Sequence, residues 1–406
     1  MTVEKEVFQG LKVLDFSWAI AGPWTVKYLA DHGAEVIHVE SLHHADVIRT
    51  GPPFKDGKPG VDSSVYWVNY HCNKYGLGLN MRHTRAQEIA KKLVSWADVI
   101  VENFSPGVMQ RWGLSYEEVR EIRPDIIMLS SSQLGQTGPL ATMRGTGIQL
   151  AAYAGFNHLT GWEDREPSVL YGGFSDCPGA RFGAVALIAA LLYRRRTGKG
   201  MHIDLSQYEA GIQMLSPALM DYQVNKRVAM RKGNRHEFAA PHGIYPCRGD
   251  DSWCAITVFT NEQWEGLCRC MDNPEWSKEA RFSTFSKRKE NEDALEHLIS
   301  GWTATLTAKE VMFRLQEAGV PAGVAQKGED LYNDPQLKQF GYFWEVDHPV
   351  IGKHQLESHA FNLPESPRKL KMPAPCMGEH TEYVCREILK LSDEEFVELL
   401  ADGVFD

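Results

Sequence analysis

Asp176 has the surroundings that a reactive carboxylate needs. It lies in Gly172-Gly173-Phe174-Ser175-Asp176-Cys177-Pro178-Gly179, at the start of an Ala/Leu-rich helix predicted over 177–195. A carboxylate in this place is often only the N-cap of its helix, with proline in the first turn. Such a carboxylate can also be a nucleophile, because backbone N–H groups around it would hold it oriented and ionised. The residues alone leave both roles open.

Two other segments are rich in small residues and follow predicted strands. Ala21-Gly22-Pro23 opens a helix, and Gly135-Gln136-Thr137-Gly138-Pro139 forms a turn or a mobile loop. Glycine allows backbone conformations and close approaches that side chains forbid. We therefore expect the backbone to come close to a ligand at both places.

Several common reaction chemistries lack their sequence signatures. No Gly-x-Gly-x-x-Gly or Walker loop follows a predicted strand, and Gly-x-Ser-x-Gly is absent, which disfavours nicotinamide, nucleoside triphosphate and serine-hydrolase chemistry. The eight cysteines form no Cys-x-x-Cys pair, and the fifteen histidines form no His-x-x-x-His pair. We therefore expect no metal site.

Length and charge limit the class of protein. A chain of 406 residues exceeds the usual size of one core, so two domains are expected. The net charge of −10 argues against nucleic-acid binding, because no basic excess is available to neutralise phosphates. The longest apolar run, near 183–193, is too short to span a membrane, and no signal peptide is evident. We expect a cytoplasmic protein without a membrane partner.

The elements that must position these residues alternate between strand and helix over the first 210 residues. Strands are predicted over 11–16, 35–40, 98–102, 126–131 and 202–205, with helices over 21–31, 85–96, 116–122, 177–195 and 207–219. This alternation predicts an α/β fold with a parallel sheet covered on both faces. In such sheets ligands bind at the carboxyl ends of the strands, beside helix N-termini.

A smaller α/β region is predicted after a polar, basic linker over 222–237. It has a strand at 253–258 and helices at 263–271 and 292–302. The tail is proline-rich from residue 364 and is predicted to be helical over 379–400.

Taken in order, these segments resemble the family III CoA-transferases, which include formyl-CoA transferase and carnitine CoA-transferase. The resembling segments are Leu14-Asp15-Phe16, Ala21-Gly22-Pro23, Asp31-His32-Gly33-Ala34-Glu35-Val36-Ile37, Asn73-Lys74, Val101-Glu102-Asn103-Phe104, Pro106-Gly107, Arg111-Trp112-Gly113-Leu114, Gly135-Gln136-Thr137-Gly138-Pro139, Thr197-Gly198-Lys199-Gly200 and Gly378-Glu379-His380-Thr381. The resemblance implies a large Rossmann-like domain built from residues 1–221 and 327–406, a small domain from 222–326, and two interlocked protomers.

The resemblance also implies roles for individual residues. Asp176 takes the position of the family's catalytic aspartate, and Asn103, Phe104 and Arg111 match positions that contact CoA. Lys74 and Arg49 are further candidates for contacts with the CoA phosphates, because Ser41 stands where the family often has a basic residue.

A mechanism follows from these implied roles. Asp176 attacks an acyl-CoA, such as succinyl-CoA, to form a mixed anhydride, and the released thiolate then forms an aspartyl-CoA thioester. Backbone N–H groups near Gly172 and Gly173, or near Gly135 and Gly138, stabilise the oxyanions. CoA and acyl-CoA are substrates, and no permanently bound cofactor is needed.

Gly145-Thr146-Gly147 bears on the alternatives and on the substrate. Racemases of the same fold carry Gly-His-Asp here, and this chain has no acid/base group in these positions, which disfavours an α-methylacyl-CoA racemase. Small Thr146 and Gly147 could open a pocket for an aromatic or substituted dicarboxylate, lined by residues such as Trp18, Tyr153 and Phe156. They could instead only let a loop pack closely.

The assembly also stays open at this point. The chain could form a homodimer, or it could be a subunit of a heteromer with a homologous chain. A non-catalytic subunit would be expected to lose the nucleophile, whereas Asp176 is present.

Overall fold

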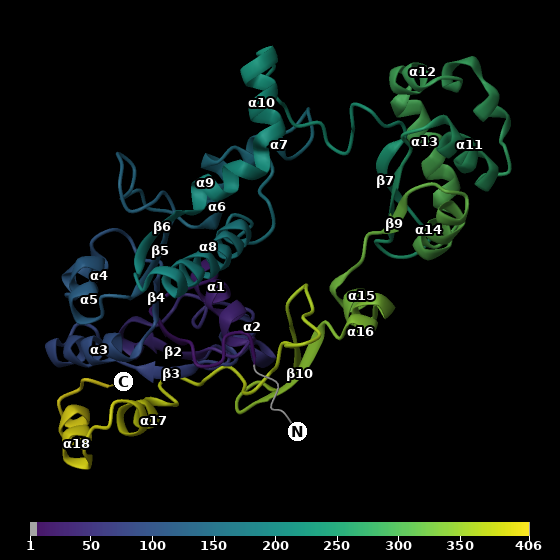
Figure 1. The fold of residues 1–406 in the computed structure, drawn as a ribbon. Coiled ribbons are helices and arrows are strands. Elements are labelled where there is room, and N and C mark those ends of the chain that lie inside the picture. The colour runs from purple at the N-terminus through teal and green to yellow at the C-terminus, as the bar shows by residue number, and fades with distance from the viewer. Residues whose placement is uncertain (1–5, 406) are drawn as a thin grey trace. The chain divides into compact units, whose positions relative to one another are not determined.

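The computed structural model describes residues 6–405 and is built on a six-stranded parallel sheet (Figure 1). Its strands are β1 (Lys12–Asp15), β2 (Glu35–Glu40), β3 (Tyr75–Gly78), β4 (Val99–Glu102), β5 (Ile127–Ser132) and β6 (Met201–Ser206). The spatial order is β3-β2-β1-β4-β5-β6, and every neighbouring pair is parallel. The predicted α/β class with a parallel sheet is confirmed. The strand order reverses between β1 and β4, where doubly wound sheets form a binding crevice.

The strands β1 to β5 are largely buried on both faces and are rich in apolar residues. On the edge strand β6, His202 and Asp204 are exposed. Helices α1 (Ala21–Ala30) and α8 (Asp176–Thr197) cover the face that carries Val13, Val99 and Leu129. Helices α3 (Thr84–Trp96) and α5 (Tyr116–Ile122) pack near the opposite face, in the cluster that holds Leu14, Ile100 and Met128. By length and composition α8 could cross a membrane, and the face of α8 that carries Leu187 and Ala190 packs against the sheet.

The C-terminal segment covers the edge strand β3. The N–H groups of Gly76 and Gly78 donate to His380 Nδ1 (3.2 Å) and Thr381 Oγ1 (3.0 Å), and His380 N donates back to Gly76 O. An uncovered strand edge invites pairing with another chain, so this contact protects the sheet. The predicted continuous helix over 379–400 is wrong. The chain forms α17 (Thr381–Tyr383), a π-helical turn (Val384–Ile388) and α18 (Asp393–Ala401).

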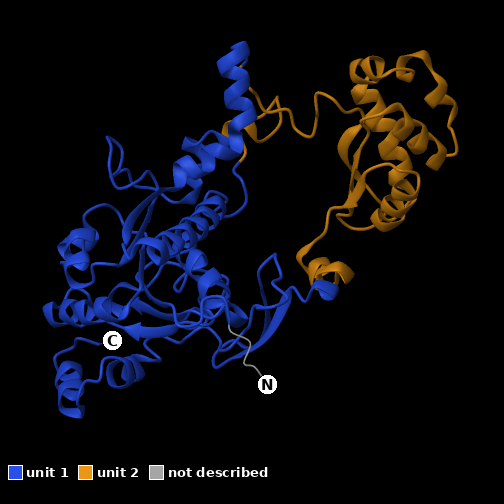
Figure 2. Ribbon diagram, in the orientation of Figure 1, with its two compact units in different colours: residues 1–156, 169–227, 338–406 blue, residues 157–168, 228–337 orange. Residues whose placement is uncertain are grey.

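The chain divides into two compact units (Figure 2). Unit 1 comprises residues 1–156, 169–227 and 338–406, and includes the hairpin of β10 (Phe343–His348) and β11 (Gly352–Glu357). Unit 2 comprises residues 157–168 and 228–337.

Unit 2 has its own core beneath a three-stranded antiparallel sheet. The strands are β7 (His242–Pro246), β8 (Trp253–Thr257) and β9 (Ala322–Val324), and α11 (Asn261–Cys270), α13 (Glu292–Thr303) and α14 (Ala308–Glu317) pack around them. The remaining α-helices of the chain are α2 (Val65–His71), α4 (Val108–Arg111), α6 (Gly147–Tyr153), α7 (Phe156–Leu159), α9 (Gln207–Ile212), α10 (Ser216–Asn225), α12 (Phe285–Glu290), α15 (Gly328–Asn333) and α16 (Pro335–Phe340).

Candidate active site

Asp176 is the first residue of α8, and the N-cap is Ser175. Of the two roles that the sequence left open for Asp176, the N-cap role thus belongs to Ser175. Asp176 N donates to Gly173 O (2.9 Å), which closes the turn before the helix. The buried Ser175 Oγ donates to Gly147 O (3.1 Å). This bond ties the start of α8 to the segment that begins α6.

Two glycines enclose the Asp176 carboxylate. Its Oδ2 lies only 2.0 Å from the point that a Cβ at residue 173 would occupy, and 3.0 Å from the corresponding point at residue 147. Ile20 Cδ1 lies 3.3 Å from the same Cβ position at residue 173. Gly173 and Gly147 are thus needed here because the carboxylate occupies the space that their side chains would take.

Burial raises the pKa of Asp176 to about 6. The carboxylate is therefore still mostly ionised at neutral pH, yet it is more basic than an ordinary aspartate. A more basic carboxylate is a better nucleophile. This combination suits covalent catalysis.

Three acidic or amide side chains shape the loop that carries Ile20. Asn103 Oδ1 accepts from Trp18 N, and Asn103 Nδ2 donates to Trp18 O, both at 2.7 Å. Asp46 Oδ2 accepts the N–H of Ala19 (2.8 Å). Ala19 has a left-handed backbone conformation, with a φ of 60°. Asp15 Oδ1 accepts the N–H of Ser17 (3.0 Å). Asn103 therefore positions this loop, which brings Ile20 to the site of Asp176.

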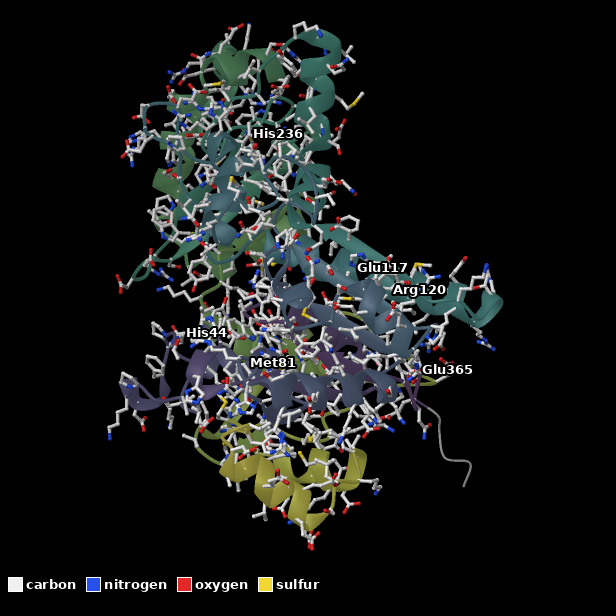
Figure 3. The ribbon with its side chains drawn as sticks, turned by 90° about the vertical axis from the view of Figure 1, so that its left-hand side faces the viewer. His44, Met81, Glu117, Arg120, His236 and Glu365 are labelled. Carbon is white, nitrogen blue, oxygen red and sulfur yellow. The ribbon has the colours of Figure 1, made fainter. Side chains whose placement is uncertain are left out.

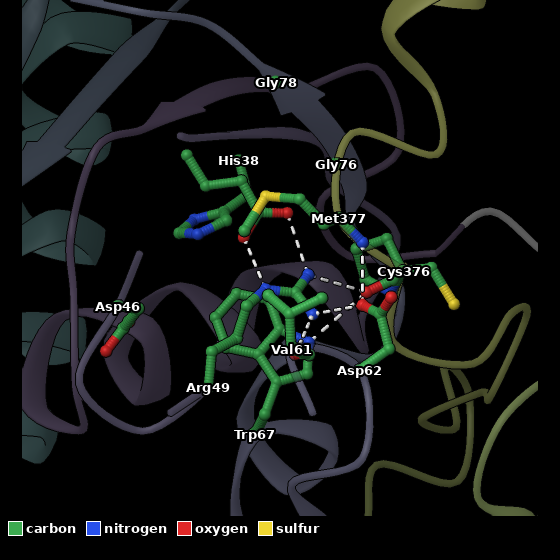
Figure 4. Close-up of polar contacts among 12 residues, drawn as sticks. His38, Asp46, Arg49, Val61, Asp62, Trp67, Gly76, Gly78, Cys376 and Met377 are labelled. Carbon is green, nitrogen blue, oxygen red and sulfur yellow. Dashed lines mark hydrogen bonds and ion pairs between the residues drawn. The ribbon is translucent and has the colours of Figure 1, made fainter. Parts of the chain in front are cut away.

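Arg49 lies in a buried ion-pair cluster (Figure 4). Its Nε and Nη2 donate to both carboxylate oxygens of Glu40 (2.7 and 2.8 Å), and Nη1 donates to Asp62 (2.7 Å). The carbonyls of Val61 and Pro375 take the remaining two donors. All five guanidinium N–H groups are occupied, so the structure does not offer Arg49 to a CoA phosphate.

Lys74 is likewise fully buried. Its Nζ donates to Asp15 Oδ2 (2.9 Å) and to Pro23 O (3.1 Å). It therefore lies beneath the helix that starts at Ala21, and not at a surface that a phosphate could reach. The expected phosphate contacts of Arg49 and Lys74 were placed wrongly because their buried acidic partners cannot be recognised from sequence spacing.

The other predicted CoA contacts do line a cavity. Asn103, Phe104 and Arg111 border a space of about 610 Å³ together with Gln133, Arg144 and other residues. Gly145 also lines it, and a Cβ there would lie 3.2 Å from Gln133 Oε1. Since Gly147 adjoins Asp176, the segment 145–147 connects this cavity with the carboxylate.

Thr146 does not point a free side chain into an acyl pocket. It forms a capping box with Gln149 at the start of α6, in which Thr146 Oγ1 donates to Gln149 Oε1 (2.6 Å). With the space beside Gly147 taken by Asp176, the small residues here serve close packing. This geometry removes the basis for a large acyl pocket at Thr146 and Gly147.

The aromatic residues proposed for that pocket lie in different surroundings. Trp18 packs edge-on against Phe104, at a centroid distance of 5.3 Å. Tyr153 contacts Tyr208, and Phe156 contacts Phe174, which is two residues before Asp176. Of the three, Phe156 is thus linked most directly to the turn that precedes Asp176.

The glycines of the 135–138 loop lie beside β6. A Cβ at Gly135 would lie 3.6 Å from Asp204 Oδ1, and Gln136 N donates to the same oxygen (2.9 Å). Gly138 has a left-handed φ of 100° and open space around it. The structure thus brings Gly173 to Asp176, with Gly172 next to it in the chain, whereas the contacts of the 135–138 loop are with Asp204.

An apolar pocket of about 70 Å³, which the sequence did not reveal, lies where β1, β2 and β4 end. Trp18 contacts His44 (4.8 Å between centroids), and Phe104 contacts Trp112 (5.3 Å). His44 and Met81, which both line it, are labelled in Figure 3. Aromatic residues just beyond the strand ends were the available signal. Among residues 6–405 no group of three or more His, Cys, Asp or Glu side chains could hold a metal ion.

Comparison with known proteins agrees with this geometry. CoA-transferase family III matches residues 8–381. The chain is 30% identical over 395 residues to succinyl-CoA–D-citramalate CoA-transferase of Chloroflexus aurantiacus, covering 97% of each chain. It is also 30% identical over 400 residues to human succinyl-CoA:glutarate CoA-transferase, covering 98% of this chain and 90% of the relative.

A solved structure of a CAIB/BAIF family protein from Brucella suis superposes with a TM-score of 0.86. It is 31% identical and covers 95% of this chain and 100% of its own. The chain belongs to CoA-transferase family III, and it is accordingly an enzyme of the CoA-transferase class.

Proposed function

We propose that this CoA-transferase moves CoA from succinyl-CoA to a short dicarboxylic acid, with Asp176 as the residue that carries the transferred group. The observation that carries the proposal is the Asp176 carboxylate, enclosed by Gly147 and Gly173 at the start of α8. The segment 145–147 joins it to the cavity lined by Asn103 and Arg111.

The reaction proceeds through two covalent species. Asp176 attacks the thioester carbonyl of the donor, the C–S bond breaks, and a mixed anhydride and CoA thiolate result. The thiolate attacks the Asp176 carbonyl, which releases the donor acid as a carboxylate and leaves an aspartyl-CoA thioester. The acceptor carboxylate then repeats both steps in reverse. CoA held in the cavity provides a high effective concentration of thiolate.

Each attack creates an oxyanion close to Asp176. The backbone N–H groups of Gly172 and Gly173 lie in the turn that precedes Asp176, and the N-terminus of the 22-residue helix α8 adds a favourable dipole. We assign oxyanion stabilisation to this turn rather than to Gly135 and Gly138, whose contacts lie beside Asp204.

The aromatic pocket is suited to the adenine ring of CoA. Trp18, Phe104 and Trp112 present flat apolar surfaces at the carboxyl ends of β1 and β4, where the strand order reverses. Phe104 borders both this pocket and the larger cavity. Arg111 and Arg144 line the larger cavity and supply cations for the CoA phosphates.

The names of the two relatives indicate which acids donate and accept CoA in those proteins. Their names specify succinyl-CoA with D-citramalate and with glutarate, which are aliphatic dicarboxylates. The space at Gly147 is occupied by Asp176, which argues against a bulky aromatic acid. We therefore propose a short aliphatic dicarboxylate as acceptor.

A panel of acceptors tests this proposal. Purified protein is incubated with succinyl-CoA and with glutarate, citramalate, malate, formate or an aryl-substituted succinate, and the CoA products are identified by mass spectrometry. We expect transfer to one or more of the aliphatic dicarboxylates. Transfer to the aryl acid alone would restore the large-pocket interpretation, and absence of transfer to every acid would refute the proposed acid class.

We further propose that two copies of this chain interlock as a dimer. The outer face of α8 exposes Val185 (64%), Ile188 (42%) and Leu192 (49%), which line a groove of about 940 Å³ with Tyr28 and Phe361 among its other residues. A monomeric protein rarely leaves such a long apolar surface uncovered. Helix α10 likewise has no buried residue.

A further inference from the structure

A second polar cavity lies beside the CoA-binding segment. It has a volume of about 180 Å³ and forms at the carboxyl ends of β4 and β5, beneath the chain around α4 and the start of α5. Its lining residues are Glu102, Ser105, Gly107, Met109, Gln110, Ser115, Tyr116, Met128, Ser130, Gln136 and His202. None of them is a lysine or an arginine.

Strand register aligns a buried acid with an exposed base. Glu102 of β4 pairs with Ser130 of β5, which pairs with Asp204 of β6, and His202 lies two residues earlier on the same face. Ser130 Oγ lies 2.9 Å from His202 Nε2 and also hydrogen-bonds the Glu102 side chain. Tyr116 stacks on the imidazole at a centroid distance of 5.2 Å. Glu102 is 2% exposed, whereas His202 is exposed to solvent.

Glu102 also holds the segment that lines the CoA cavity. Its Oε2 accepts the N–H of Phe104 at 2.7 Å. Phe104 borders both the aromatic pocket and the larger cavity, and Asn103 holds the backbone of Trp18. A change at this one carboxyl therefore acts on both sides of the proposed CoA site.

We propose that Glu102 is a positioning residue whose protonation, exchanged with solvent through Ser130 and His202, sets the affinity for CoA. The inference rests on the proposed CoA site. The relay is balanced: the Glu102 proton passes to Ser130, the Ser130 proton passes to His202 Nε2, and the other imidazole nitrogen releases a proton to water. The result is an ionised Glu102 that accepts from both Ser130 and Phe104.

The direction of the effect follows from the charges around Glu102. Burial raises its pKa to about 7, and Asp204 on β6 adds to the increase, whereas the hydrogen bonds from Ser130 and Phe104 oppose it. The other titratable groups facing the cavity are His202 on β6, whose pKa is lowered because its ring is partly shielded from water, and Tyr116 on α5. The negative charge of Glu117 on α5 raises the pKa of His202 and so opposes this lowering.

Ionisation should strengthen the hold on Phe104. A carboxylate accepts a backbone N–H more strongly than a neutral carboxyl group does. As pH rises through about 7, Glu102 loses its proton and the segment 103–104 becomes more firmly held. The affinity for CoA should therefore be higher above this pH than below it.

The test measures the equilibrium dissociation constant of CoA by calorimetry from pH 5.5 to 8.5, which requires no turnover. For the wild-type protein we expect Kd to fall about fivefold across pH 7. Glu102→Gln keeps an acceptor for Phe104 N–H but cannot ionise, so this step should disappear. Ser130→Ala removes a hydrogen bond to the ionised carboxylate, so its step should move to higher pH.

Glu121→Gln is the matched control. Glu121 is exposed on α5, and its replacement by Gln removes the same charge as Glu102→Gln does. Its Kd curve should follow that of the wild type. A wild-type step that persists in Glu102→Gln would overturn the inference while CoA binding stood. Absence of CoA binding by the wild type at every pH would instead refute the proposed CoA site.

Discussion

Three buried or half-buried aspartates show how the surroundings of a residue decide its role. Burial alone would raise the pKa of Asp15 and Asp31, but Lys74 and Lys27, respectively, lower it, so both stay ionised as structural anions. Asp176 has no such cation, and burial raises its pKa to about 6. Of these three, the aspartate proposed as the nucleophile is thus the one whose charge no lysine compensates.

This arrangement should cost stability, which Asp176→Asn would restore. The folded-state pKa of about 6 lies above the ordinary value of 3.8, so the folded protein binds the proton more tightly and loses stability as pH rises through this range. At pH 8 we expect Asn to stabilise unit 1 by about 1–2 kcal/mol, allowing for solvent screening, or a Tm about 3 °C higher.

Thermal unfolding at pH 8 and at pH 5 measures this effect. The gain should shrink at pH 5, where the wild-type carboxyl is largely protonated. Asp164→Asn, at an exposed loop position, serves as control and should change Tm little at either pH. An equal gain for Asp176→Asn at both pH values would contradict the burial argument.

The roles of single residues could be predicted from the sequence only in part. Asp176 was singled out through its glycine-rich turn and its position in a known family, and its role as nucleophile stays a prediction. Arg49 and Lys74 were misjudged, because sequence spacing does not show that Glu40, Asp62 and the Pro375 carbonyl surround Arg49 or that Asp15 binds Lys74. Asp46 was missed because its contact with Ala19 depends on a left-handed turn.

At the scale of elements, the site depends on how closely two loops approach the start of α8. Gly173 precedes the helix, and Gly147 begins α6. Neither contact could be predicted from periodicity, which located α8 itself to within two residues at each end. Strand β3 was missed because its four residues include two glycines, a composition atypical of strands.

Adding a methyl group at either glycine should displace Asp176. In Gly173→Ala the new Cβ would lie 2.0 Å from Oδ2, so the carboxylate must move, and we expect kcat to fall about 100-fold. In Gly147→Ala the distance is 3.0 Å, and a smaller loss of about tenfold is expected. Steady-state kinetics with succinyl-CoA measures both variants.

Gly301→Ala, in α13, controls for the substitution itself because its Cβ would meet nothing within 4 Å. We expect unchanged kcat and a slightly more stable helix. Full activity in Gly173→Ala would show that Asp176 does not act from the position seen here.

At the scale of the whole molecule, the sequence anticipated two α/β regions but not the course of the chain between them. Residues 157–168 belong to unit 2 although they precede α8. They contact a segment that follows much later in the chain. Gly233 N donates to Gly161 O (2.8 Å), and a Cβ at Gly233 would collide with the ring of Trp162. Such pairing over some seventy residues has no periodic signature.

The proposed dimer predicts that charged residues on the exposed face of α8 should prevent dimerisation. Wild-type protein should sediment at twice the chain mass of 45.8 kDa. Replacing Ile188 and Leu192 together by Lys should produce monomers with unchanged helix content, because buried charges at an apolar interface are unfavourable. Val397→Lys, on the exposed face of α18, should leave the dimer intact.

Analytical ultracentrifugation measures all three proteins, and circular dichroism verifies their folding. A wild-type protein that sediments as a monomer at micromolar concentration would contradict the proposed dimer. A double variant that remains fully dimeric would show that the α8 face is not the interface.

The most direct test of the proposed mechanism is whether CoA becomes covalently attached to Asp176. Protein is mixed with succinyl-CoA without an acceptor, quenched in acid, digested and analysed by mass spectrometry. We expect a CoA thioester on the peptide containing Asp176, its loss on addition of hydroxylamine, and no adduct in Asp176→Ala. A CoA adduct on another residue, or CoA transfer by Asp176→Ala at the wild-type rate, would contradict it.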